Sequence, residues 1–107
     1  MDDLALLRMV LSRPEVNAGA RTGTAVLAFL IGYSRGRAES NNPVSSWDNI
    51  FEQVRLSLSQ SLALAPENAL AVSQLLERRS GGDDAKAFEV LAAEIENALR
   101  AGASPAR

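Results

Sequence analysis

The sequence predicts an all-α protein: a compact bundle of about five helices in a single domain, with no sheet. Alanine and leucine, which favour helices, dominate a composition that is 47% hydrophobic and 22% charged. Only 5% of the residues are aromatic, so the core must be built mainly from aliphatic side chains. A chain of 107 residues is long enough to enclose one such core.

The first helix is expected over residues 3–12. Asp2 or Asp3 can cap its free amide groups, and Leu4, Leu7 and Leu11 share one face. Pro14 disfavours α geometry at the residue before it, so the helix should stop there.

The second helix should begin near Asn17 or Thr22 and run to about Gly36. It is apolar on almost all sides, which predicts a place at the centre of the bundle. Its small residues should allow a neighbouring backbone to approach closely; they are Ala25, Ala28, Gly32 and Gly36. If the helix continued, Arg37 would face the same side as the core residues, so we expect Gly36 to end it in a left-handed conformation.

A polar linker at residues 38–45 leads to a third helix over residues 47–64, with Ser46 as its cap. One narrow face of this helix is apolar, formed by Trp47, Ile50, Phe51, Val54, Leu58 and Leu62. Residues 54–64 also alternate with period two, as a strand would. We favour the helix, because the apolar face is continuous and the chain offers no other strand for pairing.

The fourth helix should open at Ala65–Pro66–Glu67, with proline in its first turn, and end at Ser80–Gly81–Gly82. Asp83 or Asp84 should cap a fifth helix that ends at Gly102. The domain is therefore expected to span residues 1–102, and residues 103–107 to form a frayed tail.

Several chemistries are excluded by composition. The chain has no cysteine and no histidine, so cysteine zinc sites and nucleophile–histidine catalysis cannot occur. Asp83–Asp84 lacks the alternating oxygen ligands of a calcium loop, which leaves capping as its expected role. We therefore expect no catalytic residues, no cofactor and no metal.

The net charge of −2 conceals an asymmetry along the chain. From Arg8 to Arg37 there are five arginines and a single acidic residue, Glu15, whereas acidic residues predominate after that stretch. Such a basic first half can reflect complementarity within the molecule or between subunits, an anionic ligand, or arginines scattered over a solvated surface.

The least ordinary stretch is AVLAFLIGYSRGR, residues 25–37. It lacks the spacing of a phosphate-binding loop, and Arg35 and Arg37 would sit favourably at the negative end of a helix. The alternative is a site for an anion or an acidic partner, made by these arginines and Arg21 beside Tyr33. Trp47 is either an interface anchor or a residue at the edge of the core.

The segment GTAVLAFLIGYSRGRAE, residues 23–39, resembles the LAFL helix of the small all-helical subunits of type III CRISPR effector complexes. That resemblance implies basic residues lining a nucleic-acid channel. This chain is acidic overall, so we take no function from it.

Together these features predict a non-catalytic protein–protein interaction module, such as an assembly subunit, an adaptor or an inhibitor. Its contact surface is expected around Tyr33, Arg35, Arg37 and Trp47, and its partner is another protein of unknown identity. Leu6, Leu56 and Val90 lie off the main apolar faces of their helices, which leaves homo-oligomerisation open.

The alternative function is a small helical nucleic-acid-binding subunit that uses the basic N-terminal half. No apolar run reaches the length that spans a bilayer, and Asp2 and Asp3 stand where a targeting signal would be basic. We therefore expect a cytoplasmic protein with no membrane association.

Overall fold

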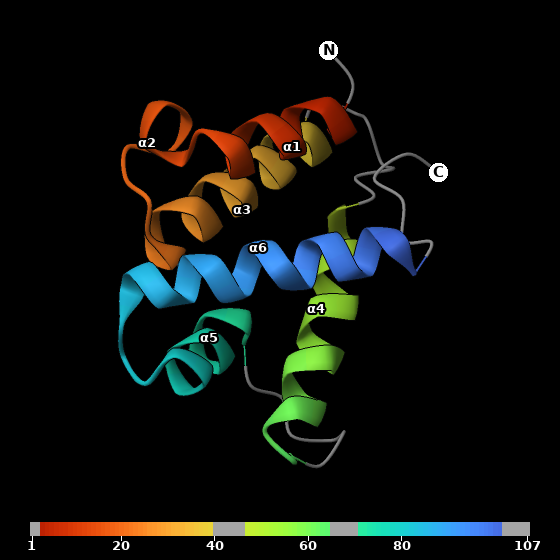
Figure 1. Cartoon of the computed structure of the whole chain (residues 1–107). Coiled ribbons are helices and arrows are strands. Elements are labelled where there is room, and N and C mark those ends of the chain that lie inside the picture. Colours follow the sequence, from red (N-terminus) through yellow and green to blue (C-terminus); the bar gives the residue numbers. More distant parts are fainter. Residues whose placement is uncertain (1–2, 40–46, 65–70, 102–107) are drawn as a thin grey trace.

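The computed structural model describes the backbone of residues 3–39, 47–64 and 71–101, and the side chains of residues 5–33, 50–64 and 71–101. Within these ranges the chain forms six helices and no strand, so the predicted all-α class is confirmed (Figure 1). The helices are α1 (Asp3–Ser12), α2 (Pro14–Asn17), α3 (Gly23–Glu39), α4 (Trp47–Ser61), α5 (Val72–Ser80) and α6 (Asp84–Arg100).

Helix α6 lies at the centre of the bundle. It packs against α3, α4 and α5, and Figure 1 shows α1, α2 and α3 on one side of it, α5 on the other, and α4 crossing it. Its buried face runs almost its whole length: Ala87, Phe88, Leu91, Ile95 and Ala98. The prediction that the second helix of the sequence would be central is therefore wrong. Among the described side chains of α3, which end at Tyr33, Leu30 is the last buried one, and Ile31 and Gly32 are exposed.

The predicted first helix is confirmed as α1, although its capping residues lie outside the described side chains. Pro14 both ends α1 and opens the short helix α2, because a proline is favourable at the first helical position. This short helix was missed in the sequence. Beyond it, Gly19 takes a positive φ of 89° and turns the chain toward α3.

The start of helix α3 agrees with Thr22, one of the two starts expected from the sequence. The Thr22 hydroxyl accepts a hydrogen bond from the amide of Ala25 at 3.2 Å, so Thr22 caps the helix. The predicted end at Gly36 is wrong, because α3 continues to Glu39. That prediction assumed that the core follows the helix along its full length. Tyr33, three residues beyond the last buried position, is already half-exposed, and one internal glycine costs a helix only about 1 kcal/mol.

Helix α4 shows that the stretch with two possible periodicities is helical through Ser61. Ile50, Val54 and Leu58 of the predicted apolar face are buried. The helix stops three residues before its predicted end, where Ala63 adopts a left-handed φ of 56° and the amide of Leu64 donates to the carbonyl of Ser59.

Helix α5 begins at Val72. The expected opening at residues 65–67 lies outside the described residues, and Ala71 is extended directly before Val72. Its end agrees with the sequence: Gly81 has a left-handed φ of 67°. Asp83 then caps α6 as expected, accepting a hydrogen bond from the amide of Lys86 at 3.2 Å. The predicted end of the fifth helix at Gly102 and the tail at residues 103–107 lie outside the described residues.

Candidate functional site

An open cleft of about 310 Å³ lies between the start of α3, one side of α5 and the start of α6. Its floor is apolar and buried, formed by Leu27, Leu76 and Ala87. Its rim is polar and exposed, formed by Thr24, Ser73, Gln74, Glu77 and Asp84. The volume is at the lower end of the range for pockets that hold small ligands or single side chains.

The start of α3 is fixed against α6 by a close approach at Gly23. A Cβ atom added there would lie 2.6 Å from the Cβ of Ala87 and 3.0 Å from its backbone carbon. The sequence predicted close packing through the small residues of this helix, but at Gly32 a Cβ would meet nothing within 4 Å. That prediction is wrong at Gly32. At Gly36 the surroundings lie outside the described part of the structure.

A second contact at the same place joins the first turns of two helices. The Oδ1 atom of Asp84 accepts a hydrogen bond from the Thr24 amide at 2.9 Å and another from the Thr24 hydroxyl at 3.1 Å. Asp83 and Asp84 therefore divide the capping role: Asp83 caps its own helix, and Asp84 satisfies an amide at the start of α3.

Thr24, Glu77 and Asp84 were not predicted as site residues. The paired aspartates gave a signal for a helix start, but not for a contact between helices. Glu77 lies on the exposed side of α5 and looks in the sequence like any solvated charge. The cleft is a product of packing between segments far apart in the chain, so no local pattern marks it.

A second surface feature follows the outward side of α3. Thr24, Ala28, Ile31 and Gly32 are exposed at the spacing of one helix face, and none of them carries a charge. Ile31 is 37% exposed and is one of two large apolar residues, with Val16 at 78%, that stand out from the described surface. We call these four residues the α3 strip. Thr24 belongs to both the strip and the cleft, so the two surfaces are continuous.

Of the four predicted contact residues, only Tyr33 has a described side chain. It is half-buried and packs against the hydrophobic core. Arg35 and Arg37 belong to the last turns of α3, and Trp47 is the first residue of α4, but their side chains lie outside the described set. Leu6, Leu56 and Val90, which raised the question of oligomerisation, are all half-buried.

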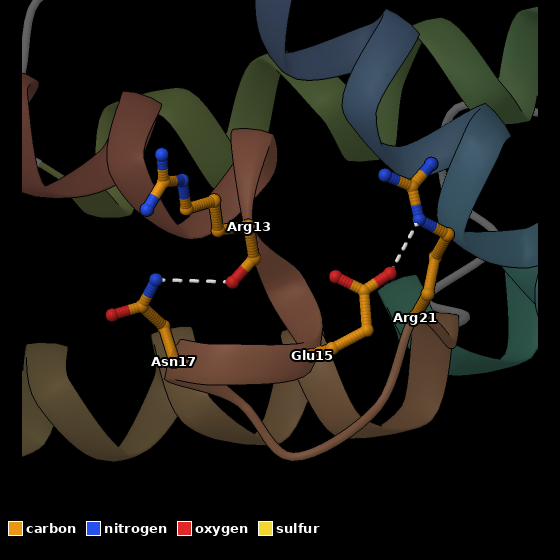
Figure 2. Close-up of polar contacts among 4 residues, drawn as sticks. All are labelled: Arg13, Glu15, Asn17 and Arg21. Atoms are coloured by element: carbon orange, nitrogen blue, oxygen red, sulfur yellow. Dashed lines mark hydrogen bonds and ion pairs between the residues drawn. The ribbon is translucent and has the colours of Figure 1, made fainter.

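Two of the three described arginines of the basic half, Arg8 and Arg21, pair with carboxylates within the molecule. Figure 2 shows the Arg21 guanidinium donating from Nε to the Glu15 carboxylate, a distance of 2.8 Å, while the Asn17 amide donates to the carbonyl of Arg13 at 3.0 Å. The hydrogen bond from Arg21 holds the pKa of Glu15 below its ordinary value of 4.5. The guanidinium also lies 5.3 Å from the ring centre of Phe88.

Another arginine, Arg8, pairs with Glu96 across α1 and α6, with Nη1 3.2 Å from Oε1. The Arg13 guanidinium points away from Glu15 in Figure 2 and has no ion-pair partner within the described ranges. Of the three interpretations of the charge asymmetry, these contacts support complementarity within the molecule for Arg8 and Arg21.

Comparison with known proteins gives no match: no family model, no curated protein and no solved structure is similar to this chain. Over the described residues, no helix is both long enough and apolar enough to cross a bilayer.

Proposed function

We propose that this protein is a non-catalytic interaction module that binds another protein through the α3 strip. The observation that carries this proposal is the uncharged, exposed side of a helix whose other sides are apolar and packed in the core. A helix that is apolar all round is normally covered on all sides. Exposed apolar surface with a polar surround is typical of a place where a partner docks.

One predicted contact residue, Arg35, continues the face of the α3 strip along the same helix. Arg35 comes four residues after Ile31 and seven after Ala28, the spacing of one helix face. The positions of Tyr33 and Arg37 instead have the helical spacing of the side that carries Val26 and Leu30, and Trp47 opens the next helix. Arginine contributes strongly to binding at many protein interfaces, which supports including Arg35 in the contact surface, while Tyr33, Arg37 and Trp47 stay predictions from the sequence.

The experiment compares two variants that each add one positive charge to an exposed apolar position. Ile31→Arg changes the α3 strip, and Val16→Arg changes α2, where the side chain is even more exposed. The tagged protein is used to capture binding proteins from a nuclease-treated lysate of the organism that encodes it. We expect one protein in stoichiometric amount, retained by Val16→Arg and lost by Ile31→Arg. Equal capture by both variants would show that the strip is not the contact surface.

The same capture tests the alternative function as a nucleic-acid-binding subunit. That function would give recovery of nucleic acid alone without nuclease, lost when Arg35 and Arg37 are both changed to alanine and weakening steeply with salt. Two of the three described arginines in the basic half already have carboxylate partners, which favours the protein-binding proposal. Capture of a second copy of this chain, also lost in Ile31→Arg, would identify the partner as the protein itself.

A further inference from the structure

The cleft beside the start of α3 has the chemical character of a receptor for a long cationic side chain. Two of its lining residues, Glu77 and Asp84, are acidic, and none of its described lining residues is a lysine or an arginine. Its floor is aliphatic, from Leu27, Leu76 and Ala87. An arginine has the matching shape, because its apolar stem can lie on such a floor while its charged end stays at a polar rim.

The helix ends around the cleft leave this negative charge in place. The starts of α3 and α6 each contribute about half a positive charge, and the end of α5 contributes about half a negative charge. Asp84 offsets the positive end of α3 by accepting a hydrogen bond from the Thr24 amide, and Asp83 offsets that of α6 by accepting one from the Lys86 amide. Glu77 is then surplus negative charge at the rim, so the cleft favours a cation over an anion.

The rim also has acceptors that the fold does not use. Asp84 takes both bonds from Thr24 on one oxygen, Oδ1, which leaves Oδ2 available. The Glu77 carboxylate has no hydrogen bond or ion pair with any described residue. A guanidinium presents five donors in a planar fork, so it can satisfy several carboxylate and hydroxyl oxygens at once.

We propose that the cleft receives an arginine side chain of the protein partner, with its stem over Leu27 and Leu76 and its guanidinium between Glu77 and Asp84. The source of that arginine rests on the proposed function, since Thr24 joins the cleft to the α3 strip and a partner lying along the strip would reach the cleft. The pocket's preference for the arginine side chain does not depend on that function.

The test is a titration of the isolated ¹⁵N-labelled protein, followed by NMR, with two probes of similar length. N-acetylarginine amide carries the cation, and N-acetylnorleucine amide carries an aliphatic chain without charge. We expect the arginine probe to shift the amide signals of Gly23, Thr24, Gly82 and Asp84 in a saturable way. The norleucine probe should bind measurably more weakly. Equal binding of both probes, or shifts confined to other surfaces, would overturn the proposal.

Two variants that remove the same charge complete the design. Glu77→Gln acts inside the cleft, whereas Glu89→Gln acts on an exposed site of α6 that does not line it. Asp84 is left unchanged because it also holds the start of α3. We expect Glu77→Gln to weaken the arginine probe by about two- to fivefold and Glu89→Gln to leave it unchanged. Equal weakening in both variants would mean that overall charge, and not the cleft, attracts the probe.

The outcomes separate this inference from the function on which it partly rests. Probe binding at the cleft together with partner capture that survives Ile31→Arg would retain the arginine site and reject the α3 strip. No probe binding at the cleft together with capture lost in Ile31→Arg would reject the arginine site and retain the strip.

Discussion

Helices α3 and α6 are both 17 residues long, and they meet where Gly23 approaches Ala87, yet they use their surfaces in different ways. Helix α6 separates its residues sharply, with one face buried and the opposite face charged. Helix α3 is apolar nearly all round but buries only the side that carries Val26, Leu27 and Leu30.

A helix that is apolar on nearly all sides, such as α3, therefore need not lie at the centre of the bundle. A central helix needs a buried face that stays in contact with its neighbours along its length, which α6 has, whereas in α3 the two residues after Leu30 are exposed. Apolar residues on the remaining side of α3 contribute little to the fold of the isolated chain, because they stay in contact with water. The α3 strip is therefore the surface that we propose for partner binding.

Truncation of one aliphatic side chain on each helix should have very different effects on stability. Leu91→Ala removes a fully buried side chain from the middle of α6 and should lower the free energy of unfolding by about 2–5 kcal/mol. Ile31→Ala removes an exposed side chain from α3 and should change it by no more than about 0.5 kcal/mol. Urea denaturation followed by circular dichroism measures both values. A comparable loss in the two variants would show that the α3 strip is covered within the fold.

A pair of glycine substitutions tests the close contact between α3 and α6. Gly23→Ala should destabilise the protein by about 1–3 kcal/mol, because the new Cβ would collide with Ala87. Gly32→Ala meets open space inside the same helix and should stabilise it by about 0.5–1 kcal/mol through helix propensity.

Thermal and urea denaturation measure the stability of the two alanine variants. Because the chemical change is the same in both, a difference in stability reports the surroundings of each glycine. A partial recovery in the double variant Gly23→Ala with Ala87→Gly would locate the strain at the helix crossing. Stabilisation of Gly23→Ala on its own would mean that α3 and α6 do not approach as closely as the structure shows.

What the sequence could predict here was mostly local. The turn glycine Gly81, the Asp83 cap and the start at Thr22 follow from residue chemistry within a few positions, and all three are confirmed. The end of α3 was mispredicted, because whether position 37 must be buried depends on how far the neighbouring helices extend. The site of close helix packing was mispredicted for the same reason. The sequence pointed to Gly32, but α6 approaches α3 at Gly23.

The candidate site could be predicted still less. Glu77 and Thr24 are separated by more than fifty positions in the chain, and only the packing of α5 against α3 places them on one cleft. Arg21 was grouped with the arginines of a binding surface, but its carboxylate partner Glu15 lies six residues before it, across the turn that follows α2. Spacing of that kind has no helical or strand periodicity, so the sequence alone does not signal it.

The smallest expected effect is on the ion pair between Arg21 and Glu15. Its measurement tests whether Glu15 already neutralises this arginine of the basic half. Arg21→Ala removes the hydrogen bond that keeps the pKa of Glu15 low, so that pKa should rise toward 4.5. A pH titration of the side-chain carboxyl signals by NMR measures the shift. Glu52, whose pKa is lowered by its own hydrogen bond from Arg55, is the internal control and should not move.

The sign of the accompanying stability change follows from the lowered pKa. A carboxylate with a depressed pKa in the folded state stabilises the protein above its unfolded-chain pKa, which is about 4.3 for glutamate. That contribution disappears as the pH falls through the lower, folded-state value. Wild type and Arg21→Ala should therefore differ slightly more at neutral pH than in acid, and the difference that persists in acid reports the packing of Arg21 on Phe88. A Glu15 pKa that is unchanged in the variant would instead leave Arg21 free to serve a partner, and would bring the basic half back as a binding surface.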